Sequence, residues 1–182
     1  MPVRIFASVI ALIFSGAVFA QAARDKLDGF YKHTFGTSFA ELKQQLGPSA
    51  GESVWVSSDK SLRLKTLTHH DPALRIGLES HFVTYYFGKD DTLIAAAFVS
   101  KYQSKEDDDV AVCYKTSGVI GELVARYGNP NSQRERDDAL YVLFGFKDGS
   151  EIEAKVESDD KDCELRVLMR SAAGEKQKLF VD

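Results

Sequence analysis

The chain has 182 residues, enough for one domain or two small ones. With 44% hydrophobic, 11% aromatic and 27% charged residues it can bury a core, which excludes a disordered or collagen-like chain. The 23 basic and 27 acidic residues give a formal charge of -4 without a basic stripe, so we expect no nucleic-acid partner.

Residues 1–22 have the pattern of a secretory signal. Arg4 is the only charged residue before Arg24, and residues 5–20 are apolar or small. Small residues at Ala20 and Ala22 match the positions that a signal peptidase reads. The apolar run is shorter than the roughly 20 residues of a membrane-spanning helix. We therefore expect a periplasmic or secreted protein that has no membrane anchor after cleavage.

The first half of the remaining chain is predicted to contain one helix followed by strands. Residues 26–35 read as a short helix or turn. Ser38 and Glu41 form a capping box for a helix that ends at Gly47-Pro48. Apolar and aromatic patterning predicts strands at 54–56, 62–68, 81–87 and 93–99. Both faces of 93–99 are apolar, so we expect a central strand there, with a helix as the alternative.

The second half repeats this order. A helix over residues 119–127 is preceded by Thr116 and Ser117 as N-cap candidates and ends at Gly128-Asn129-Pro130. Alternating apolar residues predict strands at 140–146, 151–156 and 163–169. We predict an α+β fold of two successive modules, each a helix packed on an antiparallel sheet. An internal duplication and chance similarity are the two explanations of the repeated order. The predicted organisation is signal 1–22, first module 23–105, second module 106–172 and flexible tail 173–182.

This arrangement resembles two groups of exported proteins, the β-lactamase inhibitor proteins and the BamE outer-membrane assembly factors. The resemblance rests on Leu46-Gly47-Pro48 and Tyr127-Gly128-Asn129-Pro130, each at the end of a helix that precedes an antiparallel sheet. The lipidated cysteine of the assembly factors has no counterpart here. The resemblance implies a protein that binds other proteins and performs no chemistry itself.

Cys113 and Cys163 are the two cysteines of the chain. In an exported protein an even pair predicts a disulfide, which we place in the second module. A reactive thiol or a metal ligand is the alternative, but no CxxC spacing is present.

Acidic residues gather before both cysteines, at Asp107, Asp108 and Asp109 and at Asp159, Asp160 and Asp162. A disulfide would draw these clusters together. Solvated loops, a surface for a basic protein partner and a calcium site are the three interpretations. We predict an exported, non-catalytic protein that binds a basic partner through this acidic surface, as an inhibitor or immunity-like protein of the cell envelope.

The alternative function is a periplasmic protein that binds a metal or small ligand through the acidic loops or through the segment that contains His69, His70 and His81. Neutral imidazoles suit zinc or copper, but adjacent residues of a strand point to opposite faces, and a solvated loop with a turn at Asp71-Pro72 explains the segment as well. We therefore expect no cofactor, with zinc or calcium as the alternative.

Enzyme activity is not predicted. The sequence has neither a Gly-x-Ser-x-Gly elbow nor a glycine-rich phosphate loop. Trp55, Tyr85, Tyr86 and Tyr102 cannot all face one core if their strands alternate, so some of them are candidates for an interface.

Overall fold

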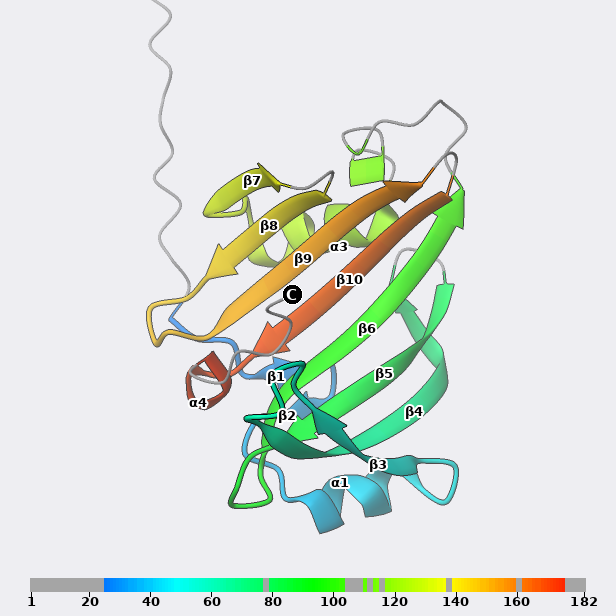
Figure 1. Ribbon diagram of the computed structural model, residues 1–182, viewed down its shortest axis with the longest axis vertical. Helices are drawn as coiled ribbons and strands as arrows, with labels where there is room; N and C mark the ends of the chain where they lie inside the picture. The colour runs from blue at the N-terminus through cyan, green and yellow to red at the C-terminus, as the bar shows by residue number, and fades with distance from the viewer. Residues whose placement is uncertain are drawn as a thin grey trace, which may run out of the picture.

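One antiparallel sheet of eight strands dominates the protein (Figure 1). The computed structural model describes residues 25–76, 79–103, 110, 113–114, 117–136, 139–159 and 162–175, and only the backbone at 71–76, 79–81, 103, 159 and 175. The strand order is β3-β4-β5-β6-β10-β9-β8-β7, and every neighbouring pair is antiparallel. The strands are β3 (Gly51–Val56), β4 (Arg63–Ile76), β5 (Glu79–Phe87), β6 (Leu93–Gln103), β7 (Ser132–Arg136), β8 (Ala139–Gly145), β9 (Glu151–Asp159) and β10 (Asp162–Arg170).

A small hairpin and several short helices accompany the sheet in the described part of the chain. The hairpin consists of β1 (Gly29–Phe30) and β2 (His33–Thr34), so the prediction of a helix or turn at residues 26–35 missed its strands. The helices are α1 (Phe39–Leu46), α3 (Gly118–Tyr127) and α4 (Ala172–Glu175). The first residues of the predicted flexible tail therefore belong to α4, while residues 176–182 lie outside the described part, as do residues 1–22.

The serine N-caps and the glycine stops predicted for the two longer helices are present, while the Glu41 carboxylate accepts a hydrogen bond from Gln45 at 3.3 Å. The Ser38 hydroxyl accepts a hydrogen bond from the Glu41 amide at 3.3 Å, and Ser117 accepts one from Ile120 at 3.2 Å. At the other ends, Gly47 and Gly128 adopt φ of 77° and 76°, and each donates its amide to the helix. Positive φ is strained for residues with a Cβ, which explains glycine at both stops.

Helices α1 and α3 cover one face of the sheet and enclose the main core with it. Figure 1 shows α3 behind β8 and β9. The helices contribute buried leucine, valine and isoleucine side chains, and the sheet contributes inward-facing residues from β4 to β10. We call the opposite face, which α1 and α3 leave uncovered, the outer face.

A second, smaller apolar cluster lies on the outer face. Its buried members are Leu64, Tyr86, Ile94, Ala95, Ala97 and Leu168. Helix α4 docks beside this cluster, because the Ser171 amide donates to the Ile94 carbonyl at 2.9 Å. A Cβ on Gly174 would lie 2.6 Å from the same oxygen, so only glycine fits there. Burial raises the pKa of Tyr86 to about 12.

The prediction of two helix-on-sheet modules is wrong, because the protein is mostly β and has one continuous sheet. β6 and β10, the last strands of the two halves, pair through nine residue positions from Ala95–Arg170 to Gln103–Asp162. The Leu27 amide, in the first half, donates to the Ser150 hydroxyl at 2.9 Å in the second. Neither half is therefore a self-contained module, because neither closes its own sheet or core.

The strand predictions were more accurate, although the segment around Asp71-Pro72 differs. Residues 93–99 lie in the central strand β6, as predicted. The expected loop and turn around Asp71-Pro72 is instead the continuation of β4, paired with β5. The register shifts between Asp71 and Arg75, where Pro72 has no amide to donate to the ladder.

Candidate binding surface

The sheet divides into two arms beyond the residue pair Val83–Phe98. β5 and β6 cease to pair at this point. β4 and β5 continue to pair as far as their ends, and so do β6 and β10. The two arms diverge in Figure 1, with β4 and β5 in one arm and β6, β10 and β9 in the other. The outer face is therefore continuous at one end and branched at the other.

Two large apolar side chains are exposed where the arms begin. Phe82 is 66% exposed and Val99 is 43% exposed, and each is next to a member of the last β5–β6 pair. The His70 ring lies 4.7 Å from the Phe82 ring on the outer face. Val99 is paired with Arg166 of β10, so an apolar and aromatic patch adjoins a charged region.

That charged region is a network of ion pairs across β9, β10 and β6. Lys155 lies 2.7 Å from Glu157, and Lys101 lies 2.9 Å from Glu164. Arg166 connects the two pairs, at 2.6 Å from Glu164 and 3.8 Å from Glu157. The hydrogen bond from Lys101, supported by Arg166, holds the pKa of the Glu164 carboxyl below its ordinary value although partial burial opposes this.

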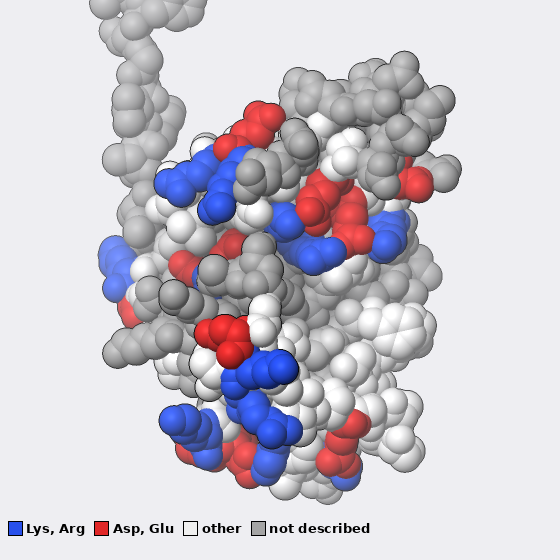
Figure 2. Space-filling model, viewed as in Figure 1, with Lys and Arg blue, Asp and Glu red and all other residues white. Residues whose placement is uncertain are grey.

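A hollow of about 540 Å³ opens at the end of these strands. It is lined by Lys101, Tyr102, Glu157, Ser158, Asp162, Cys163, Glu164 and Arg166. Figure 2 shows acidic and basic side chains in close alternation over β9 and β10, and mainly uncharged side chains over the neighbouring β4–β5 arm. Pockets for small molecules are mostly lined by apolar side chains, whereas this hollow is lined mainly by charged ones. The hollow therefore suits polar contact with a macromolecule better than binding of an apolar ligand.

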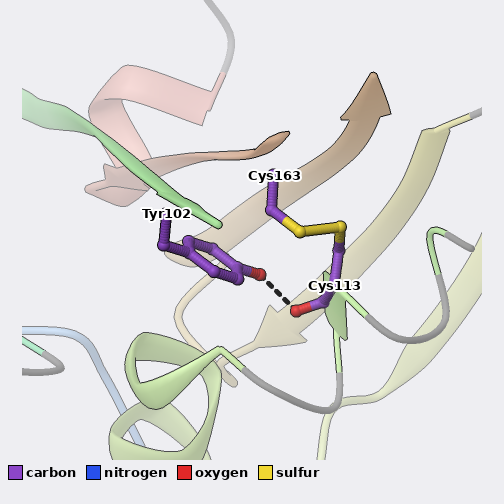
Figure 3. Close-up of a disulfide and its surroundings, with 3 residues drawn as sticks. All are labelled: Tyr102, Cys113 and Cys163. Carbon is purple, nitrogen blue, oxygen red and sulfur yellow. Dashed lines mark hydrogen bonds between the residues drawn. A yellow bond between two sulfur atoms is a disulfide. The ribbon is translucent and has the colours of Figure 1, made fainter. Parts of the chain in front are cut away.

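The predicted disulfide lies next to this region, because Cys163 is one of the residues that line the hollow. Cys113 and Cys163 are bonded, with their Cα atoms 5.6 Å apart. The Tyr102 hydroxyl donates a hydrogen bond to the Cys113 carbonyl, as Figure 3 shows. The segment before α3 is thus fixed to β10 by a covalent bond and to β6 by a hydrogen bond.

Only some of the acidic residues proposed from the sequence lie in the part of the chain that the structure describes. Asp159 and Asp162 are paired directly across the β9–β10 hairpin, and the Asp162 side chain is exposed at the rim of the hollow. Asp107, Asp108, Asp109 and Asp160 lie outside the described residues. Their neighbours Glu157 and Glu164 are held in ion pairs, so this part of the surface is less acidic than the sequence suggests.

The histidines do not converge. His69 contacts the Ser49 hydroxyl through Nδ1 at 3.3 Å, whereas His70 stacks on Phe82. The two rings lie on opposite faces of β4, as the strand geometry predicted. The His81 side chain is not among the described ones. In the described part of the chain, no three His, Cys, Asp or Glu residues gather as a metal site.

The exposure of Phe82 was not predicted from the sequence. Tyr85 and Tyr86, which were candidates for an interface, are 3% and 5% exposed and belong to the two opposite cores. Phe82 continues the outward alternation of Tyr86 but lies beyond the smaller apolar cluster. The alternation of side chains from Tyr86 predicts that Phe82 faces outward. It does not predict where β5 and β6 stop pairing, and this is what leaves Phe82 exposed.

No described helix combines the length and the apolar character needed to cross a bilayer. No family model matches the chain, and no curated protein or solved structure is significantly similar to it. The resemblance to inhibitor proteins and assembly factors therefore stays a prediction.

Proposed function

We propose that this chain is an exported, non-catalytic protein of the inhibitor or immunity type that binds another protein with the branched end of its outer face. The observation that carries the proposal is the exposure of Phe82 and Val99 beside the ion-pair network. A single exposed apolar side chain is ordinary on a protein surface. Two of them, at the point where a sheet branches, form a patch with one charged border.

The composition of this patch agrees with the usual anatomy of protein interfaces. Such interfaces have an apolar or aromatic centre, a polar rim and an enrichment of arginine. Phe82 and Val99 supply the centre, while Arg166 is half-exposed at the rim. The ion pairs of Arg166 with Glu157 and Glu164 orient its guanidinium before a partner arrives, which reduces the entropy lost on binding.

The proposed partner has an apolar side chain for the Phe82–Val99 patch and a basic group for the end of the β9–β10 hairpin. Asp162 is exposed there and lies opposite Asp159. Because the Asp162 side chain is exposed whereas those of Glu157 and Glu164 are only partly exposed, we assign the contact with a basic group to Asp162. Opposite charges speed association and make it depend on salt.

Export is supported by the signal pattern of residues 1–22 and by the disulfide, since such bonds persist in oxidising compartments.

Affinity capture from the envelope and secreted fractions of the source cells, followed by calorimetry with the purified partner, tests the proposal. Phe82→Ser should weaken the Kd at least tenfold, because it removes the centre of the interface. Asp162→Asn should lower the association rate and flatten its salt dependence. The matched controls are Val56→Ser, an exposed valine on the opposite face, and Glu135→Gln, an exposed carboxylate on β7.

A partner whose affinity is unchanged by Phe82→Ser would contradict the use of this face. Failure to recover any protein whose binding depends on Phe82 would contradict protein binding itself. Titration of the same chain with zinc and calcium tests the alternative of a metal-binding protein, which a saturable heat at micromolar ion concentration would favour.

A further inference from the structure

The two edges of the sheet differ in composition. β7, at one edge, has the sequence Ser-Gln-Arg-Glu-Arg and is exposed throughout. Charged side chains protect an edge strand against pairing with another chain. β3, at the other edge, has the sequence Gly-Glu-Ser-Val-Trp-Val, with Val54 53% exposed and Val56 41% exposed. No described strand pairs with its outer side, so this edge is open and carries one charge.

The hydrogen bonds of β3 show which backbone groups point outward. The Ser57 amide donates to the Leu62 carbonyl at 3.0 Å, so Ser57 directs its backbone groups toward β4. Because this direction alternates along a strand, Ser53 and Trp55 also bond to β4. The amides and carbonyls of Glu52, Val54 and Val56 therefore point to the open edge.

We infer that β3 pairs with β3 of a second copy of this chain, antiparallel and about a two-fold axis at Val54. Outward-facing residues then meet outward-facing residues: Val54 lies opposite Val54 of the second copy, and Glu52 lies opposite Val56 of the second copy. Each of these pairs exchanges two hydrogen bonds, as antiparallel ladders do. An axis at Ser53 would pair Glu52 with Val54 and leave fewer outward groups of β3 satisfied.

Charge also favours the axis at Val54. Val56 is paired with Arg63 of β4 in its own copy. Glu52, which already contacts Lys43 of α1 in its own copy, would share a row with Arg63 of the second copy, with one valine between them, and the symmetry repeats this arrangement. Lys65, which is paired with Val54, is 2.8 Å from Asp91 and so has its own counter-charge. Two-fold pairing of β7 about Arg134 would instead place two arginines opposite each other, which is unfavourable.

The inference uses a surface separate from the Phe82 patch and does not depend on the proposed function. Sedimentation velocity of the purified exported chain over a range of concentrations is the first measurement, and it should show a monomer–dimer equilibrium. Val54→Lys places two ammonium groups at the axis and should raise the dimer Kd at least tenfold. Ser132→Lys, the matched change on the exposed β7 edge, should leave it unaltered.

Cross-linking tests the register independently. A short bis-maleimide should join two copies of Val54→Cys but not of Lys60→Cys, which lies in the turn after β3. The native cysteines do not react, because they form the disulfide.

A chain that stays monomeric up to millimolar concentration overturns the inference. So does a dimer that Val54→Lys leaves intact, or an open-ended assembly that Ser132→Lys abolishes, since the latter would mean that β3 pairs with β7.

Discussion

The Tyr102 hydroxyl donates a hydrogen bond to the carbonyl oxygen of Cys113, whose Sγ is bonded to Cys163. Cys113 is thereby connected to two neighbouring strands, to β6 through Tyr102 and to β10 through Cys163. These are the strands that join the two halves of the sheet. The segment before α3 is therefore fixed at the centre of the sheet, beside the charged hollow.

The disulfide should contribute substantially to stability. The two cysteines are separated by 50 positions, and in the chain-entropy model a loop of this size stabilises by about 4 kcal/mol. We expect the Cys113→Ser, Cys163→Ser double variant to lose about this much free energy of unfolding, measured in urea at pH 7. Reduced wild-type protein is the control and should behave alike. A loss below about 1 kcal/mol would mean that the entropic account does not hold here.

The Tyr102 hydrogen bond should make a smaller contribution. Tyr102→Phe keeps the ring and removes the donor, so we expect a loss of about 1 kcal/mol, the usual net value of a hydrogen bond. Equilibrium unfolding of the single variant and of the variant combined with the cysteine replacements measures the coupling. Exactly additive losses would show that the hydrogen bond and the disulfide stabilise the segment independently.

Local pattern explains which parts of the fold could be predicted. Ser38, Gly47 and the alternation of strands such as β9 act within a few residues, and each of these features is present. β7 was missed because its five polar residues have no buried face. The pairing of β6 with β10 was also missed, because the local pattern of a strand does not indicate which distant strand it pairs with. This one pairing turns the expected two modules into a single sheet.

The site was predicted less well, for a related reason. The disulfide followed from cysteine count, but the charge of the surface depended on cross-strand neighbours. Glu157 and Glu164 flank the acidic residues Asp159 to Asp162 in the sequence, whereas β6 and β10 bring Lys101 and Arg166 beside them. Exposure of Phe82 results from the end of β5–β6 pairing, which sequence alternation does not encode.

Phe82 and Phe98 provide a direct check of the branched sheet. They lie on neighbouring strands, but Phe82 is 66% exposed and Phe98 is 2% exposed. Phe98→Ala should cost about 3–5 kcal/mol because it leaves a cavity in the core. Phe82→Ala should cost less than about 1 kcal/mol, as surface changes do. Similar losses in urea unfolding would show that the patch is covered in solution.

Arg170 should be needed to hold two partly buried carboxylates. Its guanidinium is in contact with Glu151 and lies 3.0 Å from Glu153, and all three side chains are largely buried. Arg170→Met should cost about 3 kcal/mol at pH 7, because it leaves buried charge without a counter-ion. Burial raises the pKa of Glu153, so protonation relieves that charge and the loss should shrink as pH falls. Arg170→Lys, which keeps the charge, is the control and should cost less.

Glu164 should make the stability of the protein decrease as the pH falls into the acid range. Its pKa in the folded state lies below the ordinary value of 4.5, chiefly because of the hydrogen bond from Lys101. The unfolded chain therefore takes up this proton first, and the contribution is present above pH 4.5 and is lost as pH falls through the folded-state pKa. Glu164→Gln should be less stable than wild type at pH 7, and the difference should vanish in acid. Urea unfolding from pH 7 to pH 3 measures it, with Glu135→Gln on the exposed edge as control; a difference that stays constant over this range would assign the loss to packing and not to charge.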